Sequence, residues 1–527
     1  MGQYLVLFVQ VSTNSSKSSH NLYNKSMKKI IKNPTIISLI VLIAVFLFSR
    51  LYNLTLLPIF TDESIYIYWA KVIESSHDQY FISLTDGKPP LLIWMISVFL
   101  TILPDSWYLV AGRLPAVIAG LCSLIFINRL THELFHDTKI TITASVLYII
   151  FPFVLLYDRM ALFDAPLQAA LLASTYFAVR TARYLRWYDA VLWGGALGAA
   201  FLSKPTAAVF MVLLPGVVLL MTLTTFTKKW KAIVSLVGLA TLVGFGINSM
   251  LRLSSVYYLM GRKNAQFQQP IEELIKNPFA LTIGNFFHGF LPWMIEYYTV
   301  PFFLIAMVGL ITLLFKNWRV GIILLVLWLA PILGLATIGR EIFPRYMLFT
   351  TPYILIAAAA FFGILASVLK KYAVVSLIVA VVVSIPFLKN DYFILTDPTK
   401  ISVPQADFNQ LVGEHPSGYG ISEVFAAVNA DLATGKSVTV VTQGTFGIYP
   451  YAFMLEYWGH DQVKILPRWP LDTIDDEIFQ AKEQGSLYIV LKEHDEIPEN
   501  LPLMLIKKIQ KPGGRDPLLL TTLSEEK

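Results

Sequence analysis

The chain has 527 residues, of which 56% are hydrophobic and only 14% are charged. This balance excludes an ordinary soluble globular protein, because apolar runs long enough to cross a bilayer recur along the sequence. The net charge of +6 does not indicate nucleic-acid binding, since the Lys and Arg residues lie mostly in short clusters between apolar runs, as membrane-flanking charges do. We therefore predict a multi-pass integral membrane protein that binds no nucleic acid.

Residues 1–33 are predicted to form a cytoplasmic N-terminal tail, because Lys28, Lys29 and Lys32 stand immediately before the first apolar run. Each long apolar run after this tail is predicted to form a helix across the membrane, so that residues 34–388 make up the membrane domain. The predicted spans cover residues 34–51, 109–130, 139–157, 162–180, 187–203, 205–227, 231–253, 299–315, 320–338, 347–369 and 372–388.

One further apolar run, from Pro89 to Leu103, is short for a span, because at about 1.5 Å per residue it does not reach across the roughly 30 Å hydrocarbon core. The basic clusters decide its placement. If this run lies along the outer surface, the later clusters share the side of the N-terminal lysines, as the positive-inside rule requires. These clusters are at residues 180–186, 228–231, 316–319 and 370–371. We therefore expect about eleven spans and an interfacial helix at 89–103.

Residues 389–527 have a different character. Alternating β-type runs at 437–441 and 486–491 are separated from one another by amphipathic or mixed stretches such as 420–434 and 472–484. This pattern predicts a small soluble α/β domain, which an odd number of spans places outside the cytoplasm. The predicted fold class is an all-α polytopic membrane protein with a C-terminal soluble α/β domain.

Two adjacent carboxylates, Asp62 and Glu63, follow the first span in the sequence FTDES. Acids near a membrane interface are often merely solvated. Here residues 65–70 are aromatic and apolar, and they predict an interfacial helix that holds the pair near the lipid headgroups. In such a partly dehydrated place, two acids can have their pKa values pushed apart or can bind a divalent cation. The outer loop 52–108, which carries this pair, is therefore the predicted catalytic loop.

A second acidic feature, Asp158 and Asp164, lies at the outer entrance of a later predicted span. Asp164 is followed by Ala165 and Pro166, a sequence that suits a helix N-cap with proline near the first helical position. This structural role is compatible with a functional one, because a carboxylate held at a helix start can also face a substrate hydroxyl.

Four cations are expected on the same outer side: Lys88, Arg113, Arg340 and Arg345. Each one alone suits an interfacial anchor whose charge reaches the headgroups. Together they supply what a phosphate needs, and arginine adds a bidentate geometry that lysine lacks. Carboxylates and phosphate-binding cations above a wall of apolar helices predict a reaction in which a lipid-anchored phosphate is the leaving group.

The order of the motifs resembles a known family. After FTDES come GKPPLLIW on the interfacial helix, AGRLPAVIAGL at the second span, RMALFDAP at the fourth, and a late PRYMLFTTP. In this order they resemble the polyprenyl-phosphate-sugar-dependent glycosyltransferases of the GT-C membrane fold, which include the protein O-mannosyltransferases and the bacterial aminoarabinose transferases of lipid A. The resemblance covers roughly residues 34–390, so it leaves the C-terminal domain and the identity of the acceptor open.

The resemblance implies roles for the acidic residues. Asp62 is similar to the catalytic general base of the first outer loop, and Glu63 is similar to its partner in orienting the acceptor or a metal. Asp164 is similar to the second acidic position of the family, whereas Asp158 stands where no acid is expected. A divalent cation (Mg²⁺, Mn²⁺ or Zn²⁺) held by Glu63 and Asp164 therefore stays open as a cofactor.

The resemblance also implies which residues contact the donor phosphate. They are Lys88, Arg113, Arg345 and Tyr346. The implied activity is transfer of a hexosyl or pentosyl group from a polyprenyl-phosphate donor, with inversion and with Asp62 as the base. The acceptor is a lipid, a polysaccharide or a protein on the extracytoplasmic face of the inner or plasma membrane.

A multi-pass transporter or lipid flippase is the alternative to an enzyme. Transporters usually carry ionisable residues near the middle of the bilayer. The predicted spans 205–227, 299–315 and 372–388 contain no Asp, Glu, Lys or Arg. The sequence therefore favours the glycosyltransferase.

Overall fold

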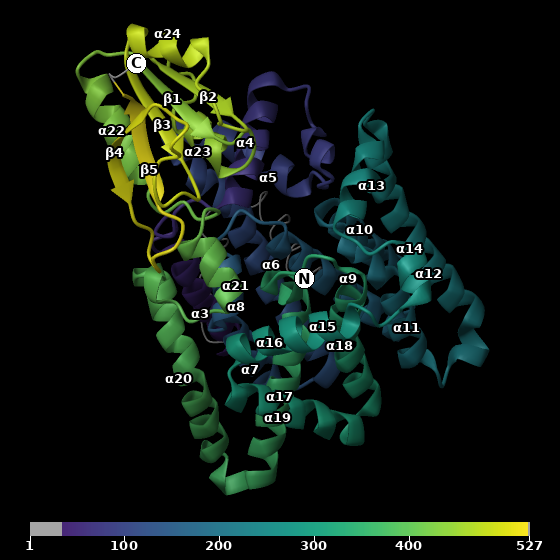
Figure 1. The fold of residues 1–527 in the computed structure, drawn as a ribbon. Helices are drawn as coiled ribbons and strands as arrows, with labels where there is room; N and C mark the ends of the chain where they lie inside the picture. Colours follow the sequence, from purple (N-terminus) through teal and green to yellow (C-terminus); the bar gives the residue numbers. More distant parts are fainter. Residues whose placement is uncertain (1–33, 525–527) are drawn as a thin grey trace, which may run out of the picture. The chain divides into compact units, whose positions relative to one another are not determined.

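The computed structural model describes residues 34–524. The chain divides into two compact units, residues 1–49 and residues 50–527. The described part of the first unit lies in helix α3, Pro34–Leu51, and the predicted cytoplasmic tail lies outside the described residues. The second unit holds the other helices and a five-stranded sheet (Figure 1).

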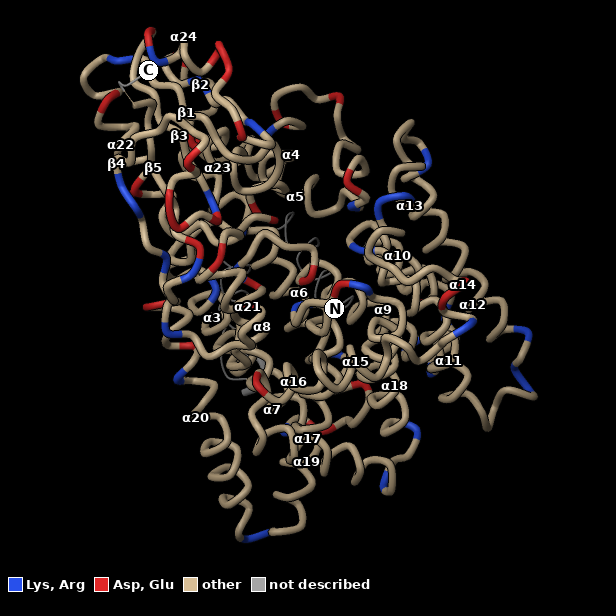
Figure 2. The backbone as a smooth tube through the Cα atoms, viewed as in Figure 1, with Lys and Arg blue, Asp and Glu red and all other residues tan. Residues whose placement is uncertain are grey.

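Long apolar helices make up most of the second unit, and in Figure 2 α17, α19 and α20 carry charge only towards their ends. Within residues 34–524, six helices are long and apolar enough to cross a membrane. They are Asp105–Phe135, Pro205–Thr222, Phe226–Leu253, Trp318–Ile338, Pro344–Tyr372 and Val374–Thr396. A seventh span exists if Thr282–Tyr298 and Val300–Lys316, which meet at 101°, are counted as one. The larger predicted number includes shorter helices and stays a prediction.

The helices of the membrane part follow the predicted spans closely. They are α6 Tyr108–Phe135, α7 Thr138–Ile149, α8 Pro152–Tyr157, α9 Asp164–Tyr184, α10 Trp187–Ser203, α11 Phe210–Thr222, α12 Phe226–Asn248, α17 Val300–Lys316, α18 Trp318–Ile338, α19 Thr351–Leu369 and α20 Val374–Thr396. The predicted span 139–157 is broken into α7 and α8, because Pro152 starts a new helix and cannot continue the old one. The predicted domain boundary at residue 389 falls inside α20.

Shorter helices lie between these long ones. The predicted interfacial run at 89–103 contains the helix α5, Leu91–Ile102, which has 12 residues. These shorter helices are α4 Thr61–Ser76, α5 Leu91–Ile102, α13 Tyr257–Gln266, α14 Ile271–Lys276, α15 Thr282–Asn285 and α16 Leu291–Tyr298. Two 3₁₀ segments, η4 Pro205–Val209 and η7 Pro344–Thr350, precede α11 and α19.

The C-terminal part confirms the predicted α/β domain. Its sheet has the order β2-β1-β3-β5-β4, in which β1 runs parallel to β2 and β3, and β5 runs antiparallel to β3 and β4. The elements are α21 Gln405–Phe408, α22 Ile421–Ala433, β1 Val438–Gln443, α23 Ile448–Glu456, β2 Val463–Arg468, α24 Asp476–Gln484, β3 Ser486–Leu491, β4 Leu503–Ile509 and β5 Leu518–Leu523. Helix α23 packs beside α4 (Figure 1), so this domain contacts the loop that carries Asp62.

Candidate active site

A cavity of about 400 Å³ brings together residues that are far apart in the sequence. Its charged side chains are Asp62, Lys88, Asp164, Lys204, Glu341 and Arg345. Its other polar side chains are Tyr66, Ser203, Thr206, Asn264, Gln268 and Tyr346. Its apolar wall comes from η4 and α18, and it includes Pro205, Ala208, Val209, Leu335 and Ile338. Five of the residues predicted from the motifs therefore line one cavity: Asp62, Lys88, Asp164, Arg345 and Tyr346.

Asp62 and Arg345 form an ion pair in this cavity. Asp62 lies in the first turn of α4, and its Oδ2 atom lies 2.8 Å from Nη2 of Arg345 in η7. The guanidinium carbon of Arg345 also lies 5.4 Å from the ring centre of Phe60, a cation–π contact that holds it over the start of α4. The carboxylate is thus paired with a cation that Phe60 also contacts.

A second ion pair joins Asp164 to Lys204, with 2.9 Å between Oδ1 and Nζ. The predicted N-cap role of Asp164 is wrong, because Phe163 is the N-cap of α9 and Asp164 is its first helical residue, with its carboxylate bonded to Lys204. Burial lowers the pKa of Lys204, and the nearby Asp164 opposes that shift. The ammonium group also lies 4.0 Å from the ring centre of Tyr346, which places it against the predicted phosphate-binding position.

Lys88 is held at the cavity by the turn that precedes it. Gly87 has a φ of +76°, and a Cβ atom there would lie 2.8 Å from Cβ of Lys263, so only glycine fits this turn without strain. The Lys88 ammonium lies 5.5 Å from the ring centre of Phe267. Among residues 34–524, no carboxylate forms an ion pair with Lys88, which leaves its charge available to an anionic ligand.

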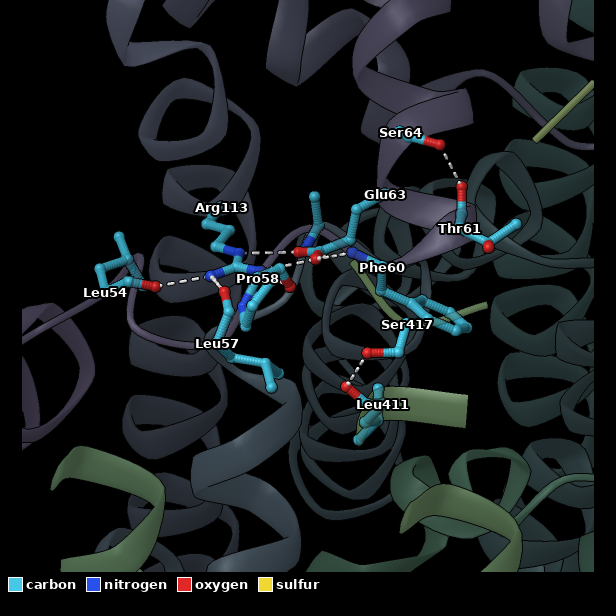
Figure 3. Close-up of polar contacts among 11 residues, drawn as sticks. Leu54, Leu57, Pro58, Phe60, Thr61, Glu63, Ser64, Arg113, Leu411 and Ser417 are labelled. Atoms are coloured by element: carbon cyan, nitrogen blue, oxygen red, sulfur yellow. Dashed lines mark hydrogen bonds and ion pairs between the residues drawn. The ribbon is translucent and has the colours of Figure 1, made fainter. Parts of the chain in front are cut away.

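Glu63 and Arg113 lie outside the cavity and are bonded to each other. Arg113 donates from Nε to Oε1 of Glu63 at 2.8 Å and from Nη2 to Oε2 at 2.7 Å. Its Nη1 atom donates to the carbonyl oxygens of Leu54 and Leu57, as Figure 3 shows. Both side chains are almost fully buried, at 0% and 1% exposed. We therefore revise their predicted roles in substrate binding, because their polar atoms are used inside the protein.

The same two oxygens of Glu63 also accept backbone hydrogen bonds. Oε2 accepts from the N–H of Phe60 at 3.0 Å, as a glutamate does three residues into a helix, and Oε1 accepts from the N–H of Ala161 at 2.8 Å. The pair therefore fastens the start of α4, and with it Asp62, to α6 and to the segment before α9.

The chain is similar to known proteins in sequence and in fold. Residues 87–247 match the model of the family described as dolichyl-phosphate-mannose-protein mannosyltransferase. No curated protein sequence matches the chain significantly. The solved structure of ArnT from Cupriavidus metallidurans in the apo state matches with a TM-score of 0.56 and 13% identity, over 92% of this chain and 97% of that one.

The structure of the same ArnT bound to undecaprenyl phosphate matches with a TM-score of 0.53 and 14% identity, over the same shares of the two chains. The chain has the fold of these ArnT structures. The predicted GT-C fold class is thereby confirmed over 92% of the chain. The resemblance predicted from the motifs is confirmed at the level of sequence for residues 87–247.

The residues present do not fit the predicted metal site. Glu63, one of the two expected ligands, has both oxygens committed to Arg113 and to backbone N–H groups. Asp164, the other, is paired with Lys204. Within residues 34–524, no group of three or more His, Cys, Asp or Glu side chains is arranged to hold a metal ion. The structure therefore offers no protein ligand set for Mg²⁺, Mn²⁺ or Zn²⁺ at these residues.

Two residues named in the sequence analysis lie elsewhere. Asp158 is buried and lies 3.3 Å from Nε of Arg50, away from the cavity lining. Arg340 is exposed and lies 3.4 Å from Glu273. Neither residue lines the cavity, although both are close in sequence to residues that do.

Lys204 is the main residue that the sequence analysis missed. It stands between the predicted spans 187–203 and 205–227, where it marked only a boundary. The predicted topology nevertheless places this junction on the same outer side as Asp62 and Asp164. A single lysine between two apolar runs on that side, directly before Pro205, was the signal that could have found it.

Replacing Lys204 with Met is expected to lower the stability of the protein by about 2 kcal/mol or more, because it leaves the buried Asp164 carboxylate without its partner. The second change Asp164→Asn in the same chain is expected to restore part of that loss. The measurement is the Tm of the purified protein in detergent, with the exposed Lys228→Met as a matched control. If the Tm of Lys204→Met equals that of the wild type, the ion pair between Lys204 and Asp164 contributes nothing to the stability of the protein.

Proposed function

We propose that this protein is a membrane glycosyltransferase that moves a sugar from a polyprenyl-phosphate carrier to an acceptor. The observation that carries the proposal is the cavity itself. It joins three cations, Lys88, Lys204 and Arg345, to three carboxylates beside an apolar wall. The carboxylates are Asp62, Asp164 and Glu341. A lipid-linked sugar phosphate has the complementary parts: an anion, a hydroxylated ring and a hydrocarbon chain.

The apolar wall supports a lipid carrier. Residues of η4 and α18 line one side of the cavity, and the corresponding helices, Pro205–Thr222 and Trp318–Ile338, are both apolar enough to cross a membrane. A hydrocarbon chain lying against them would bury apolar surface that would otherwise contact water, which is favourable by about 25 cal/mol per Å². One of the two ArnT structures with this fold holds undecaprenyl phosphate, a carrier of the same class.

The charges support a phosphate at the polar end. Asp62 and Asp164 are each paired with one cation, whereas Lys88 forms no ion pair within residues 34–524; Glu341, the third carboxylate of the lining, is exposed. A phosphate that reaches Lys88 also competes with Asp62 for Arg345, since guanidinium binds phosphate with two parallel hydrogen bonds. Binding of the donor would then release the Asp62 carboxylate from its ion pair.

Released in this way, Asp62 is the general base of the proposed reaction. It takes the proton from an acceptor hydroxyl or amine while the acceptor atom forms a bond to the anomeric carbon. The bond from that carbon to the phosphate oxygen breaks, and polyprenyl phosphate leaves with the electron pair, stabilised by Lys88 and Arg345. A single displacement of this kind inverts the anomeric configuration.

The place of the reaction is part of the same proposal. The positive-inside rule puts the cavity residues on the extracytoplasmic side of an inner or plasma membrane. An acceptor would therefore be a lipid, a polysaccharide or a protein on that side. The packing of α23 from the C-terminal domain beside α4 supports an acceptor that meets this domain as it approaches the cavity.

Replacing Lys88 with Ala is expected to weaken the binding of undecaprenyl phosphate about tenfold or more, because a hydrogen bond to a charged group contributes about 1.5–3 kcal/mol. The measurement is the Kd of the purified protein for this lipid in detergent micelles. Lys276→Ala, which removes an exposed lysine outside the cavity, should leave the Kd unchanged. Equal affinities of the Lys88→Ala and Lys276→Ala variants would contradict a phosphate at Lys88.

A further inference from the structure

A segment of the C-terminal domain, residues 414–418, contacts the loop that carries Asp62. The carbonyl oxygen of Pro416 accepts two hydrogen bonds from Thr61, at 3.0 Å from the backbone N–H and at 2.9 Å from Oγ1. Phe60 and Ser417 form an isolated antiparallel bridge. The approach is so close that a Cβ atom on Gly418 would lie 2.2 Å from the carbonyl oxygen of Ile59. The residue before Asp62 is thus bonded to a segment more than 350 residues away in the chain.

Lys511, which follows β4, holds this segment in its bent shape. Its Nζ atom donates to the carbonyl oxygens of Glu414 at 2.9 Å and of Ser417 at 2.8 Å, at the two ends of the turn that contains Pro416. The hydroxyl of Ser417 adds a hydrogen bond to the carbonyl oxygen of Leu411, visible in Figure 3. The position of the Pro416 carbonyl therefore depends on the lysine.

Because Lys511 is buried, this arrangement costs the free energy of removing its ammonium group from water. The residue is only 3% exposed, and within residues 34–524 it forms no ion pair, although Asp516 and Glu493 are near enough to favour its charge. Taking an ammonium group out of water is unfavourable by several kcal/mol unless its hydrogen bonds are satisfied. The carbonyl groups of the turn supply those bonds, so the charge and the turn depend on each other.

We propose that Lys511 is a positioning residue for Asp62, acting through the turn 414–417 and Thr61; this inference rests on the proposed function. Asp62 is fastened on two sides by other parts of the chain. Glu63 ties the helix start to Arg113, and Thr61 ties it to the C-terminal turn. The carboxylate between them is aimed at the cavity, where it meets Arg345. The C-terminal domain therefore positions an active-site residue, although none of its described residues lines the cavity.

The test replaces Lys511 with Met and measures kcat for sugar transfer together with the Kd for undecaprenyl phosphate. We expect kcat to fall about tenfold or more, because a displacement of about 1 Å at a reacting group can cost about a hundredfold in rate. The Kd should stay near the wild-type value, since neither Lys88 nor Arg345 is bonded to residues 414–417 or to Lys511. Arg345 meets the C-terminal domain through Gln410, at 3.4 Å. Lys507→Met, which changes an exposed lysine of β4, is the matched control and should keep the wild-type kcat.

The variant Thr61→Val tests the same positioning of Asp62 independently, because it removes the Oγ1 hydrogen bond to Pro416 and keeps the side-chain shape. We expect Thr61→Val to lower kcat with the Kd unchanged, and the double variant to be no slower than the slower single one. Additive losses, or a wild-type kcat in folded Lys511→Met, would overturn the proposal. Should Lys511→Met fail to fold, a wild-type kcat in Thr61→Val would overturn it as well.

The variant Asp62→Asn, measured in the same assay, distinguishes failure of the positioning role of Lys511 from failure of Asp62 as the proposed base. If Asp62→Asn is inactive while Lys511→Met and Thr61→Val keep the wild-type kcat, only the positioning role fails. If Asp62→Asn keeps the wild-type kcat, the proposed base fails, whatever the other variants do.

Discussion

Replacing Asp62 with Asn is expected to lower the rate of sugar transfer by about 10²–10⁴, which is the usual contribution of a positioned general base. The amide keeps the size of the side chain and its hydrogen-bonding oxygen, so Arg345 retains a partner and the protein should fold normally. The Kd for undecaprenyl phosphate is expected to stay the same or to improve, because Arg345 no longer has to leave a carboxylate. The measurement is kcat with a labelled polyprenyl-phosphate sugar.

Asp105→Asn is the matched control for this experiment. Asp105 lies in the same outer loop. Its side chain is 69% exposed, and its carboxylate forms an ion pair with Lys71. This variant should turn over at the wild-type rate. If Asp62→Asn also kept that rate, Asp62 would be a partner of Arg345 in the structure and would have no part in proton transfer.

Replacing Arg113 with Met is expected to destabilise the protein by about 3–5 kcal/mol, since removal of one partner from a buried ion pair leaves an uncompensated charge. Glu63 would lose two hydrogen bonds, and the carbonyl oxygens of Leu54 and Leu57 would lose their donor. The measurement is the Tm in detergent, together with the yield of folded protein. The change Glu63→Gln, made together with Arg113→Met, should recover part of the loss.

Arg340→Met is the control for that prediction. Arg340 and Glu273 form an ion pair with side chains 45% and 58% exposed, and such surface pairs contribute only about 0–1 kcal/mol. A stable Arg113→Met variant that has lost only its affinity for undecaprenyl phosphate would restore Arg113 to the phosphate site that the motif predicted.

The sequence motifs predicted five residues that line the cavity, and they also included Glu63 and Arg113, which the structure buries outside it. Asp62 and Glu63 are adjacent in the sequence, but consecutive residues on a helix point about 100° apart. Asp62 therefore faces Arg345 in the cavity, whereas Glu63 faces Arg113 in the interior. Adjacency in a short motif could not show this, because it depends on which side of α4 the rest of the protein covers.

The fold was predictable where local patterns decide it. Apolar length predicted most of the helices, and alternation predicted β1 and β3 within one or two residues. The roles of Lys204 and Lys511 were not predictable in the same way. Lys204 finds its partner forty residues earlier in the chain, and Lys511 acts on the turn around Pro416, which it meets only through the folding of the C-terminal domain. Such long-range pairs leave no periodic signal in the sequence.

The most direct test of the account follows a polyprenyl-phosphate sugar labelled in the sugar, incubated with the purified protein in bilayer nanodiscs that contain candidate membrane acceptors. Mass spectrometry would identify the products. We expect the wild type to release polyprenyl phosphate and to place the label on an acceptor, and we expect Asp62→Asn to do neither. A wild-type protein that carries the intact donor from one leaflet of a vesicle to the other, with no bond to the sugar broken, would contradict the account and identify a lipid flippase.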